Sequence, residues 1–367
     1  MKYEKEVASG AFGGVMKIFS LHVGDTKVPY GQFYGGLAGW TGARGLWKFA
    51  TDKSHYIIVP IHSYLIDHPK SGLILVDTGI SWEQAHEHGR YYKGITHYVL
   101  DDDEYLLTRE QELPAQVARL GYRIEDIQTV ILTHFHEDHV GGLRYVPEAK
   151  VVASQAEWKA LKMKAFGFIP IIYRPSIAAV KVWEPISFTS GPFHSFDTSQ
   201  DLLGDGSIIL LPTPGHDPGH MCVLVRLDGY DLLITGDIMY TLRHLAVDEV
   251  RAIQFGGKIL EQQQVDSIRR IQRLRQALPN MVIVPGHDHT DYQYCLLEPF
   301  LVNGVSSMER RKEIKAYEAR LFDSSGHLMP GAMPHFIPPE RRTGGQGCIS
   351  HDDDVDLPFC SCEGLIK

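Results

Sequence analysis

Short runs of apolar residues, bounded by turns that contain glycine, proline or aspartate, recur along most of the chain. Their length and their content of valine, isoleucine and leucine are typical of buried strands. The runs predict strands at residues 15–23, 56–66, 73–77, 129–132, 150–153, 207–212, 221–227, 231–235 and 281–284. Apolar spacing, a capping box of Ser154 with Glu157 and a charged run predict helices at residues 112–120, 154–164, 262–278 and 308–322.

The order of these elements repeats coarsely along the chain. Strands, a turn rich in histidine and aspartate, and a helix occur before residue 165 and again between residues 205 and 300. The repetition predicts an α/β fold in which two sheets pack between outer helices and several strand ends meet at one edge. Beyond residue 300, charged residues and then glycine, proline and aspartate accumulate. We therefore expect a main domain at residues 15–300 and a C-terminal extension at residues 301–367, with one helix and then largely irregular structure.

The composition narrows the class of protein. Of the 367 residues, 44% are hydrophobic and 22% are charged, which is enough for a sizeable core. The formal net charge of −9 argues against a nucleic-acid partner, which needs local positive charge, and favours a small substrate with little charge. No stretch approaches the ~20 apolar residues of a membrane helix, and residues 1–14 lack the apolar core of a secretion signal. We therefore expect a cytoplasmic protein without a membrane span, and we leave a homodimer open.

The predicted strand at residues 129–132 leads directly into a dense group of metal-ligand residue types. The segment 133–142 reads Thr-His-Phe-His-Glu-Asp-His-Val-Gly-Gly, and its ligand types are His134, His136, Asp138 and His139. Imidazole and carboxylate groups are the ligands that zinc and its neighbours prefer. A polar turn that only happens to contain histidines is the alternative, and the number and spacing of these residues disfavour it. The glycine pair at the end of the segment would let the backbone turn tightly beneath such a site.

Three further strand ends carry residues of the same types. Residues 214–220 read Pro-Gly-His-Asp-Pro-Gly-His and place His220 directly before a predicted strand. Asp237 follows another predicted strand in Thr-Gly-Asp, and His287 follows the last one in Pro-Gly-His. If these ends meet at one edge of the sheets, they complete a metal site together with the first cluster.

The order His-x-His-x-Asp-His, Gly-His-x-Pro-Gly-His, Gly-Asp and Gly-His resembles the metallo-β-lactamase superfamily, over residues 15–295. The resemblance implies an αββα sandwich with two zinc ions at its edge, so that the main domain is catalytic. It implies one zinc on His134, His136 and His220, a second on Asp138, His139 and His287, and Asp237 as the bridge between them. In the di-iron branch of the superfamily a glutamate takes the place of His136, so this histidine argues against redox chemistry. We expect His216, His289 and Asp77 to support the site without binding metal.

The residues that follow Asp237 are similar to the N-acyl homoserine lactonases, the quorum-quenching branch of the superfamily. The chain reads Asp-Ile-Met-Tyr-Thr from Asp237, and in that family a tyrosine three residues past the bridging aspartate points at the substrate. The resemblance implies a zinc-dependent hydrolase that opens the ester ring of a lactone by attack of a metal-bridging hydroxide. Tyr240 would donate a hydrogen bond to the developing oxyanion, and Asp138 would transfer the proton. An ordinary core tyrosine is the alternative for Tyr240.

Other interpretations remain beside the lactonase. A glyoxalase II-type thioesterase, a hydroxyacylglutathione hydrolase, uses the same ligands, and the basic residues of the predicted helix 308–322 would then hold glutathione. A metal-binding homologue without catalysis is disfavoured because every ligand position is filled. The glycine-rich segment 31–45 is either a flexible loop or an aromatic wall beside the site. The tail is either loose or holds a structural zinc through Cys348, His351, Cys360 and Cys362.

Overall fold

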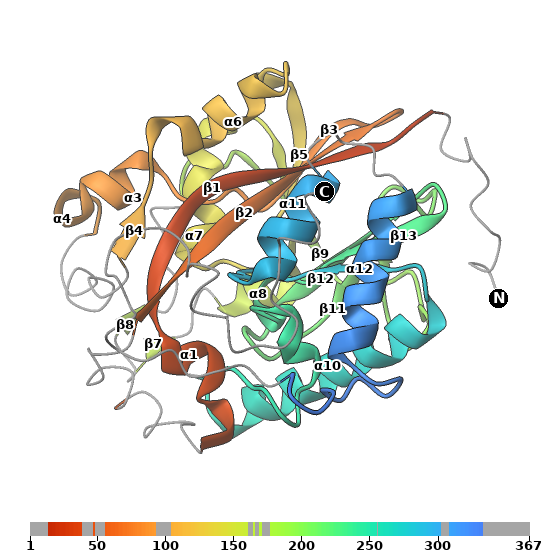
Figure 1. Ribbon diagram of the computed structural model, residues 1–367. Coiled ribbons are helices and arrows are strands. Elements are labelled where there is room, and N and C mark those ends of the chain that lie inside the picture. The colour runs from red at the N-terminus through yellow and green to blue at the C-terminus, as the bar shows by residue number, and fades with distance from the viewer. Residues whose placement is uncertain are drawn as a thin grey trace.

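Two β-sheets form the inner layers of the protein. The computed structural model describes residues 14–38, 47, 56–92, 104–160, 164–165, 169–170, 177–254, 256–301 and 308–332. The first sheet has seven strands in the order β4-β1-β2-β3-β5-β6-β9, and the second has five in the order β10-β11-β12-β13-β14. Helices lie on the outer sides of both sheets, so the predicted αββα sandwich is confirmed (Figure 1).

The bounds of the strands match the nine predicted apolar runs to within a few residues at most ends. The first sheet consists of β1 (Lys17–Pro29), β2 (Tyr56–His68), β3 (Gly72–Val76), β4 (Glu104–Leu106), β5 (Ile127–Ile131), β6 (Lys150–Ser154) and β9 (Val182–Ile186). The second consists of β10 (Gln200–Asp201), β11 (Ile208–Pro212), β12 (Met221–Leu227), β13 (Tyr230–Ile234) and β14 (Val282–Val284). A separate ribbon pairs β7 (Lys164–Ala165) with β8 (Ile169–Pro170). The short strands β4, β9 and β10 are absent from the prediction because two to five partly exposed residues leave little apolar pattern.

The helices are mostly short. They are α1 (Tyr30–Tyr34), α3 (Trp82–His86), α4 (His88–Tyr91), α6 (Leu113–Arg119), α7 (Glu137–Val140), α8 (Gln155–Ala160), α10 (Lys258–Ala277), α11 (Glu298–Leu301) and α12 (Met308–Leu321). In Figure 1, α3, α4 and α6 lie on the outside of the first sheet, and α10 lies on the side of the second. None of the described helices combines the length and the apolar character needed to cross a bilayer.

The sequence of strand β3 is almost wholly apolar because the strand is buried on both faces. Successive side chains of a strand point to opposite faces, and both faces of β3 are covered. Leu73 and Leu75 belong to the outer core with Val117 of α6. Ile74 and Val76 belong to the larger core cluster, which also contains the residues of the second sheet and the apolar stripe of α10. The fold therefore buries β3 from both sides and delivers its end, at Asp77, to the edge of the sandwich.

The predicted extension begins as part of the main core. Helix α12 buries Ile314, Tyr317 and Leu321 in the core between the second sheet and its outer helices. The ring of Tyr317 stacks on Tyr292 with centroids 5.5 Å apart. The first part of the predicted extension therefore packs against the main domain, and the domain boundary at residue 300 stays a prediction. Residues 333–367, with the cysteine-rich tail, lie outside the described residues, and the structural zinc stays a prediction.

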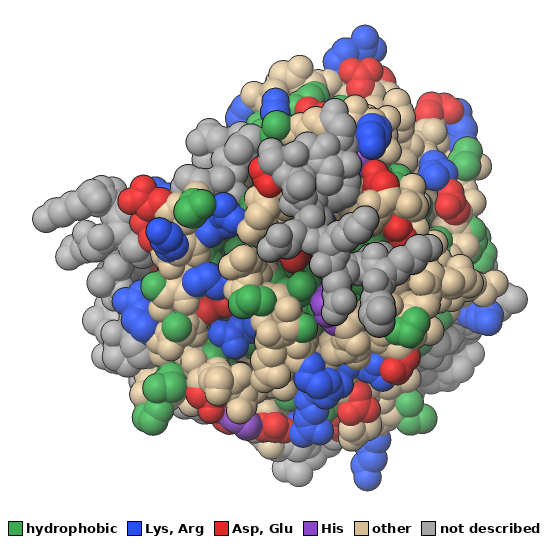
Figure 2. All heavy atoms as spheres, turned by 90° about the vertical axis from the view of Figure 1, so that its right-hand side faces the viewer, with side chains coloured by type: hydrophobic (Ala, Val, Ile, Leu, Met, Phe, Trp, Pro, Cys, Tyr) green, Lys and Arg blue, Asp and Glu red, His purple; other side chains and the backbone are tan. Residues whose placement is uncertain are grey.

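The cysteines and the surface add two observations. Cys222 is a buried free thiol, whereas Cys295 is disulfide-bonded. On the face in Figure 2, the basic and acidic side chains of the described residues are interspersed. Nucleic-acid binding uses a patch of one sign, so this face offers no such surface among the residues that the figure colours.

Candidate metal centre

The segment after β5 carries the first cluster of ligand-type residues. The strand ends at Ile131, and His136 is the N-cap residue of the single-turn helix α7. Behind it, a Cβ added to Gly142 would lie 2.2 Å from the carbonyl oxygen of Thr78. Only glycine fits at this distance, so Gly142 allows the backbone to pack closely against Thr78.

Three turns of the second half of the chain meet this cluster. His220 precedes β12, Asp237 lies in the turn after β13, and His287 follows β14. A backbone hydrogen bond from Met221 N to Thr133 O, 3.0 Å long, joins the two halves at this point. The strand ends therefore meet at one edge of the sandwich, as the order of motifs predicts.

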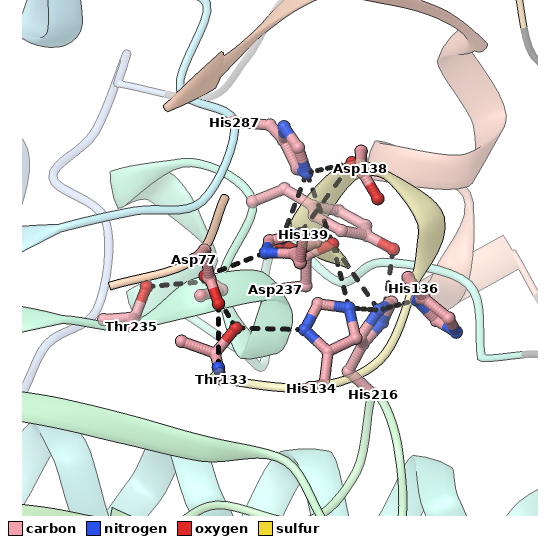
Figure 3. Close-up of polar contacts among 12 residues, drawn as sticks. Asp77, Thr133, His134, His136, Asp138, His139, His216, Thr235, Asp237 and His287 are labelled. Carbon is pink, nitrogen blue, oxygen red and sulfur yellow. Dashed lines mark hydrogen bonds and ion pairs between the residues drawn. The ribbon is translucent and has the colours of Figure 1, made fainter. Parts of the chain in front are cut away.

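The side chains at this edge form two groups with metal-binding geometry. We call the first the histidine-rich group, which consists of His134, His136, His216 and Asp237. We call the second the carboxylate-rich group, which consists of Asp138, His139, Asp237 and His287. Within each group the candidate ligand atoms all lie within 4.8 Å of one another. Figure 3 shows the labelled side chains of both groups converging from several turns of the chain.

Asp237 belongs to both groups and turns one oxygen towards each. Its Oδ2 lies 3.8 Å from His134 Nε2 and 3.5 Å from His216 Nε2. Its Oδ1 lies 3.2 Å from Nε2 of both His139 and His287, and His287 Nε2 is also 3.3 Å from Oδ2. A carboxylate that divides its oxygens in this way has the geometry of a bridge between two cations.

Hydrogen bonds on the far side of the rings fix which imidazole nitrogen faces the centre. His139 Nδ1 lies 2.8 Å from Asp77 Oδ2, and His287 Nδ1 lies 2.8 Å from the carbonyl oxygen of Pro60. Both partners accept only, so each Nδ1 carries a proton and each Nε2 is the nitrogen that faces the centre. Metal-binding histidines are oriented in this way, by an acceptor on the nitrogen that does not bind.

Two threonines contact the other pair of histidines from behind. Thr133 Oγ1 donates to Asp77 Oδ2 at 2.8 Å, so it accepts at its contact of 3.1 Å with His134 Nδ1. With Nδ1 protonated, His134 Nε2 is left to accept. Thr213 Oγ1 lies 2.9 Å from His220 Nδ1 and holds that ring in place.

Burial and charge give the two groups different electrostatic characters. Burial lowers the pKa of His134 well below its ordinary value and that of His220 to about 3, so the histidine-rich side stays neutral. Burial alone would also lower the pKa of His287, but Asp237 and Asp138 raise it to about 10. Burial would raise the pKa of Asp237, yet the neighbouring His287 and His139 hold it well below its usual range. The carboxylate-rich side therefore demands positive charge.

Several atoms at the centre are buried without a hydrogen-bond partner among the described residues. They include His139 Nε2, His220 Nε2 and Asp237 Oδ1. Leaving a buried polar atom unpaired costs about 1–3 kcal/mol, and three such atoms facing one point are rare unless a ligand satisfies them. Lone pairs of imidazole and carboxylate suit a divalent cation. The residues present therefore fit the pair of metal ions that the sequence predicts.

The structure brings together all seven residues predicted as metal ligands, with one addition. His216, predicted to support the site, lies in the histidine-rich group itself. His220 lies beside that group, with its ring centroid 5.3 Å from that of His134. Asp77 stands behind His139, and His289 lies further out, 3.1 Å from Tyr34 Oη through its Nε2. The assignment of individual ligands stays a prediction.

Tyr240 and α1 form one wall of the site. The ring of Tyr240 lies 5.7 Å from that of His216 and 5.9 Å from that of His287, so it faces both groups. Phe33 stacks on Tyr240 with centroids 4.3 Å apart and an interplanar angle of 22°. The described part of the glycine-rich segment therefore forms an aromatic wall rather than a flexible loop. Most of the remainder lies outside the described residues.

Sequence reasoning missed the residue that holds the two ligand loops together. Glu157 is buried, and its Oε1 accepts from Phe135 N at 3.0 Å while its Oε2 accepts from Gly219 N at 3.1 Å. The predicted capping box is half right, because Glu157 N does donate to Ser154 Oγ at 3.0 Å. The carboxylate itself serves the two ligand loops instead. An acidic residue directly after a buried strand is the only sequence signal for this role.

The fold and the site together define the class of protein. A model of the Metallo-beta-lactamase superfamily matches residues 57–287, which is more than half of the chain. The chain therefore belongs to the metallo-β-lactamase superfamily.

Several relatives of the chain are N-acyl homoserine lactonases. The N-acyl homoserine lactonase AttM of Rhizobium radiobacter is 30% identical over 236 residues, which cover 63% of this chain and 82% of that protein. An N-acyl homoserine lactonase of Bacillus cereus is 25% identical, over 66% of this chain and 86% of its own length. A solved N-acyl homoserine lactone hydrolase with bound N-hexanoyl-L-homoserine shares the fold with a TM-score of 0.58 at 21% identity, over 75% of this chain and 94% of its own.

These comparisons bear out the prediction of a hydrolase. The superfamily implies a divalent metal, for which the residues described above are candidates. The αββα fold and the resemblance to lactonases are likewise confirmed.

Proposed function

We propose that the protein is a binuclear zinc hydrolase that opens the ester ring of lactones, with N-acyl homoserine lactones as its substrate class. The observation that carries the proposal is the division of Asp237 between two groups of metal-ligand residues, with Tyr240 facing both. The similarity to AttM over most of that protein's length supports the choice of substrate class.

The ligands that we propose follow the motifs. His134, His136 and His220 would hold one zinc, and Asp138, His139 and His287 the other, with Asp237 between them. When bound, two such cations supply Lewis acidity and a water molecule with a lowered pKa, which is what ester hydrolysis at neutral pH needs. The chain contributes neutral imidazoles of fixed tautomer and two carboxylates.

Tyr240 is the proposed donor to the substrate. Its hydroxyl lies 3.4 Å from His216 Nδ1, at the border of the histidine-rich group. The side chain is only 2% exposed, and Phe33 stacks on its ring, so the phenol is held in one orientation. A rigid donor aimed at developing negative charge stabilises a transition state without reorganisation.

Asp138 is the proposed proton carrier. Its Oδ2 lies 3.2 Å from His287 Nε2, which fixes one oxygen in the carboxylate-rich group. Its side chain is 14% exposed, against 5% for that of Asp237, so it is the more accessible of the two carboxylates. An accessible carboxylate at the edge of the centre can pass a proton to the leaving alkoxide, which the ring-opening product requires.

The test combines metal analysis with a substrate panel. The purified chain is expected to retain about two zinc ions and to hydrolyse acyl homoserine lactones faster than simple γ- and δ-lactones or S-lactoylglutathione. Ring opening releases a proton, so a pH indicator reports every lactone in one assay. Preference for the thioester would overturn the lactonase assignment. A protein that holds two zinc ions but hydrolyses none of these substrates would overturn the proposal of a hydrolase.

Contacts of α12 weigh against the thioesterase alternative. Arg311 Nη1 donates to the carbonyl oxygen of Gly229 at 3.0 Å, and Lys315 Nζ donates to the carbonyl oxygen of Met281. Lys315 also pairs with Glu318 at 3.0 Å. These cations already serve the packing of α12, whereas glutathione recognition would need them at the metal centre.

A further inference from the structure

His216 occupies a place at the centre that no motif assigned to it. It lies in the turn between β11 and β12, four residues before His220. Its Nε2 is 2.8 Å from His136 Nδ1 and 3.2 Å from His134 Nε2. It is also 3.5 Å from Asp237 Oδ2. Figure 3 shows the rings of His134, His136 and His216 turned towards one another.

Three imidazole nitrogens converge here. His134 Nδ1 carries its proton towards Thr133, so its Nε2 holds a lone pair. His136 Nδ1 and His216 Nε2 lie 2.8 Å apart. Nitrogens at these distances need a shared proton or a cation between them, and a cation can engage all three at once.

The spacing of the nitrogens is that of ligands around one ion. Two nitrogens at about 2.05 Å from zinc lie about 3.3 Å apart at a tetrahedral angle and about 2.9 Å apart at a right angle. The distances from His216 Nε2, 3.2 Å and 2.8 Å, correspond to these two angles. A mixture of both angles is expected when a shell contains more than four ligands.

The opposite nitrogen of His216 completes the pattern. His216 Nδ1 lies 3.4 Å from Tyr240 Oη. If Nε2 binds metal, Nδ1 carries the proton and donates to the phenol oxygen, as metal-binding histidines donate to a partner behind them. The phenol oxygen then accepts from His216.

The turn that carries His216 is built to hold it in place. Gly215 has φ 148°, and a Cβ there would lie 2.4 Å from backbone atoms of Gln264 in α10. On the other side, Gly219 N donates to Glu157 and Gly219 O accepts from Ser154 Oγ at 2.6 Å. The turn is therefore anchored on both sides of His216.

We propose that His216 is a fourth imidazole ligand of the metal held by His134, His136 and His220, and that it orients Tyr240 through Nδ1. This inference rests on the binuclear centre proposed above. It gives the histidine-rich site an additional neutral ligand and links it directly to the substrate donor.

The experiment uses the full chain, stripped of metal and refilled with Co²⁺. In the proton NMR spectrum, each imidazole on Co²⁺ gives one exchangeable, strongly shifted N–H signal. His216→Ser is expected to remove one such signal and to lower the affinity of one site for Zn²⁺ at least about 10-fold, measured by chelator competition. The affinity of the other site should change less than about 2-fold. His289→Gln is the matched control, since it removes a buried imidazole that lies in neither group, and both readouts should stay unchanged.

The outcomes separate the inference from the proposal beneath it. If His216→Ser keeps every shifted signal and both affinities, His216 is not a ligand, even if kcat falls through Tyr240. If the wild-type chain binds no metal tightly, the binuclear centre itself is refuted. If His220→Ser, and not His216→Ser, loses a signal, His220 alone completes the site and the inference is overturned.

Discussion

The replacement Asp77→Asn tests whether a carboxylate behind the centre controls the metal site. Asp77 accepts three hydrogen bonds of 2.8 Å each, from Thr133 N, Thr133 Oγ1 and His139 Nδ1. Asparagine has the same shape but offers one acceptor and one donor. Its backbone conformation is not an obstacle, because the φ of 55° at Asp77 is one that asparagine adopts as readily.

The magnitude follows from where the new amide N–H₂ must point. If it faces His139, the ring must move its proton to Nε2 to accept, and Nε2 then has no lone pair for metal. If His139 keeps its tautomer, two donors oppose each other in a buried place, which costs about 1–3 kcal/mol. Loss of such a partner typically lowers metal affinity 10–100-fold, or about 1.4–2.7 kcal/mol. We therefore expect the carboxylate-rich site to lose zinc first, by that factor.

The assay is stepwise zinc release to a competing chelator, followed by kcat on the best lactone. Asp67→Asn is the matched control: Asp67 Oδ2 accepts from Tyr122 Oη at 2.7 Å, away from the ligand residues, and asparagine retains an acceptor there. Zinc affinity within about 2-fold of wild type in Asp77→Asn would refute the tautomer argument, which predicts 10-fold or more.

Four further predictions use other parts of the site. Tyr240→Phe should lower kcat about 10–100-fold with zinc content unchanged, and an unaltered kcat would remove the phenol from the reaction. His136→Ala and Asp237→Ala should each lose zinc and activity together, so full occupancy with full turnover would contradict the ligand assignment. Glu157→Ala should lower the free energy of unfolding, measured with urea, by at least about 2 kcal/mol, because two backbone N–H groups lose their acceptor. Burial lowers the pKa of His244 to about 4, against about 6.5 unfolded, so the unfolded chain binds more protons between these values. The free energy of unfolding should therefore fall by up to about 3 kcal/mol through this residue as the pH drops from 6.5 to 4. In the metal-free state, His244→Gln should lose less of its free energy of unfolding over this pH range than the wild type does.

The strands and the ligand motifs were predictable because their signals are local. A buried strand such as β12 is a continuous apolar run, and a ligand turn follows or precedes it within a few residues. The second half of the chain repeats this pattern of strand and ligand turn. The meeting of the strand ends at one edge then follows from the fold class. Local signals also explain the misses at β4 and β9, whose residues are few and partly exposed.

The contacts that tune the centre are not local and carry no such signal. Phe33 stacks on Tyr240 from a helix more than two hundred residues earlier in the chain. Asp77 reaches His139 across two strand ends, and nothing in its own surroundings distinguishes it from another aspartate after a strand. His216 was assigned a supporting role because the motif already had a histidine for each position. Its actual place depends on the path of one anchored turn, which only the structure reveals.

The metal centre lies where the two halves of the chain meet, and neither half carries a complete ligand set. The first half supplies the residues after β5, and the second supplies His216, His220, Asp237 and His287. Polar contacts across the seam at this edge include Met221 N to Thr133 O, Gly219 N to Glu157, and His287 Nδ1 to Pro60 O. Cations shared by both sides therefore act as cross-links of the folded state and are absent from the unfolded one. At zinc concentrations of 1,000 times Kd, each site would add about 4.1 kcal/mol to the free energy of unfolding. On the proposed ligand assignment, bound zinc would hold the sandwich closed at this edge, which would tie the stability of the seam to the occupancy of the metal centre.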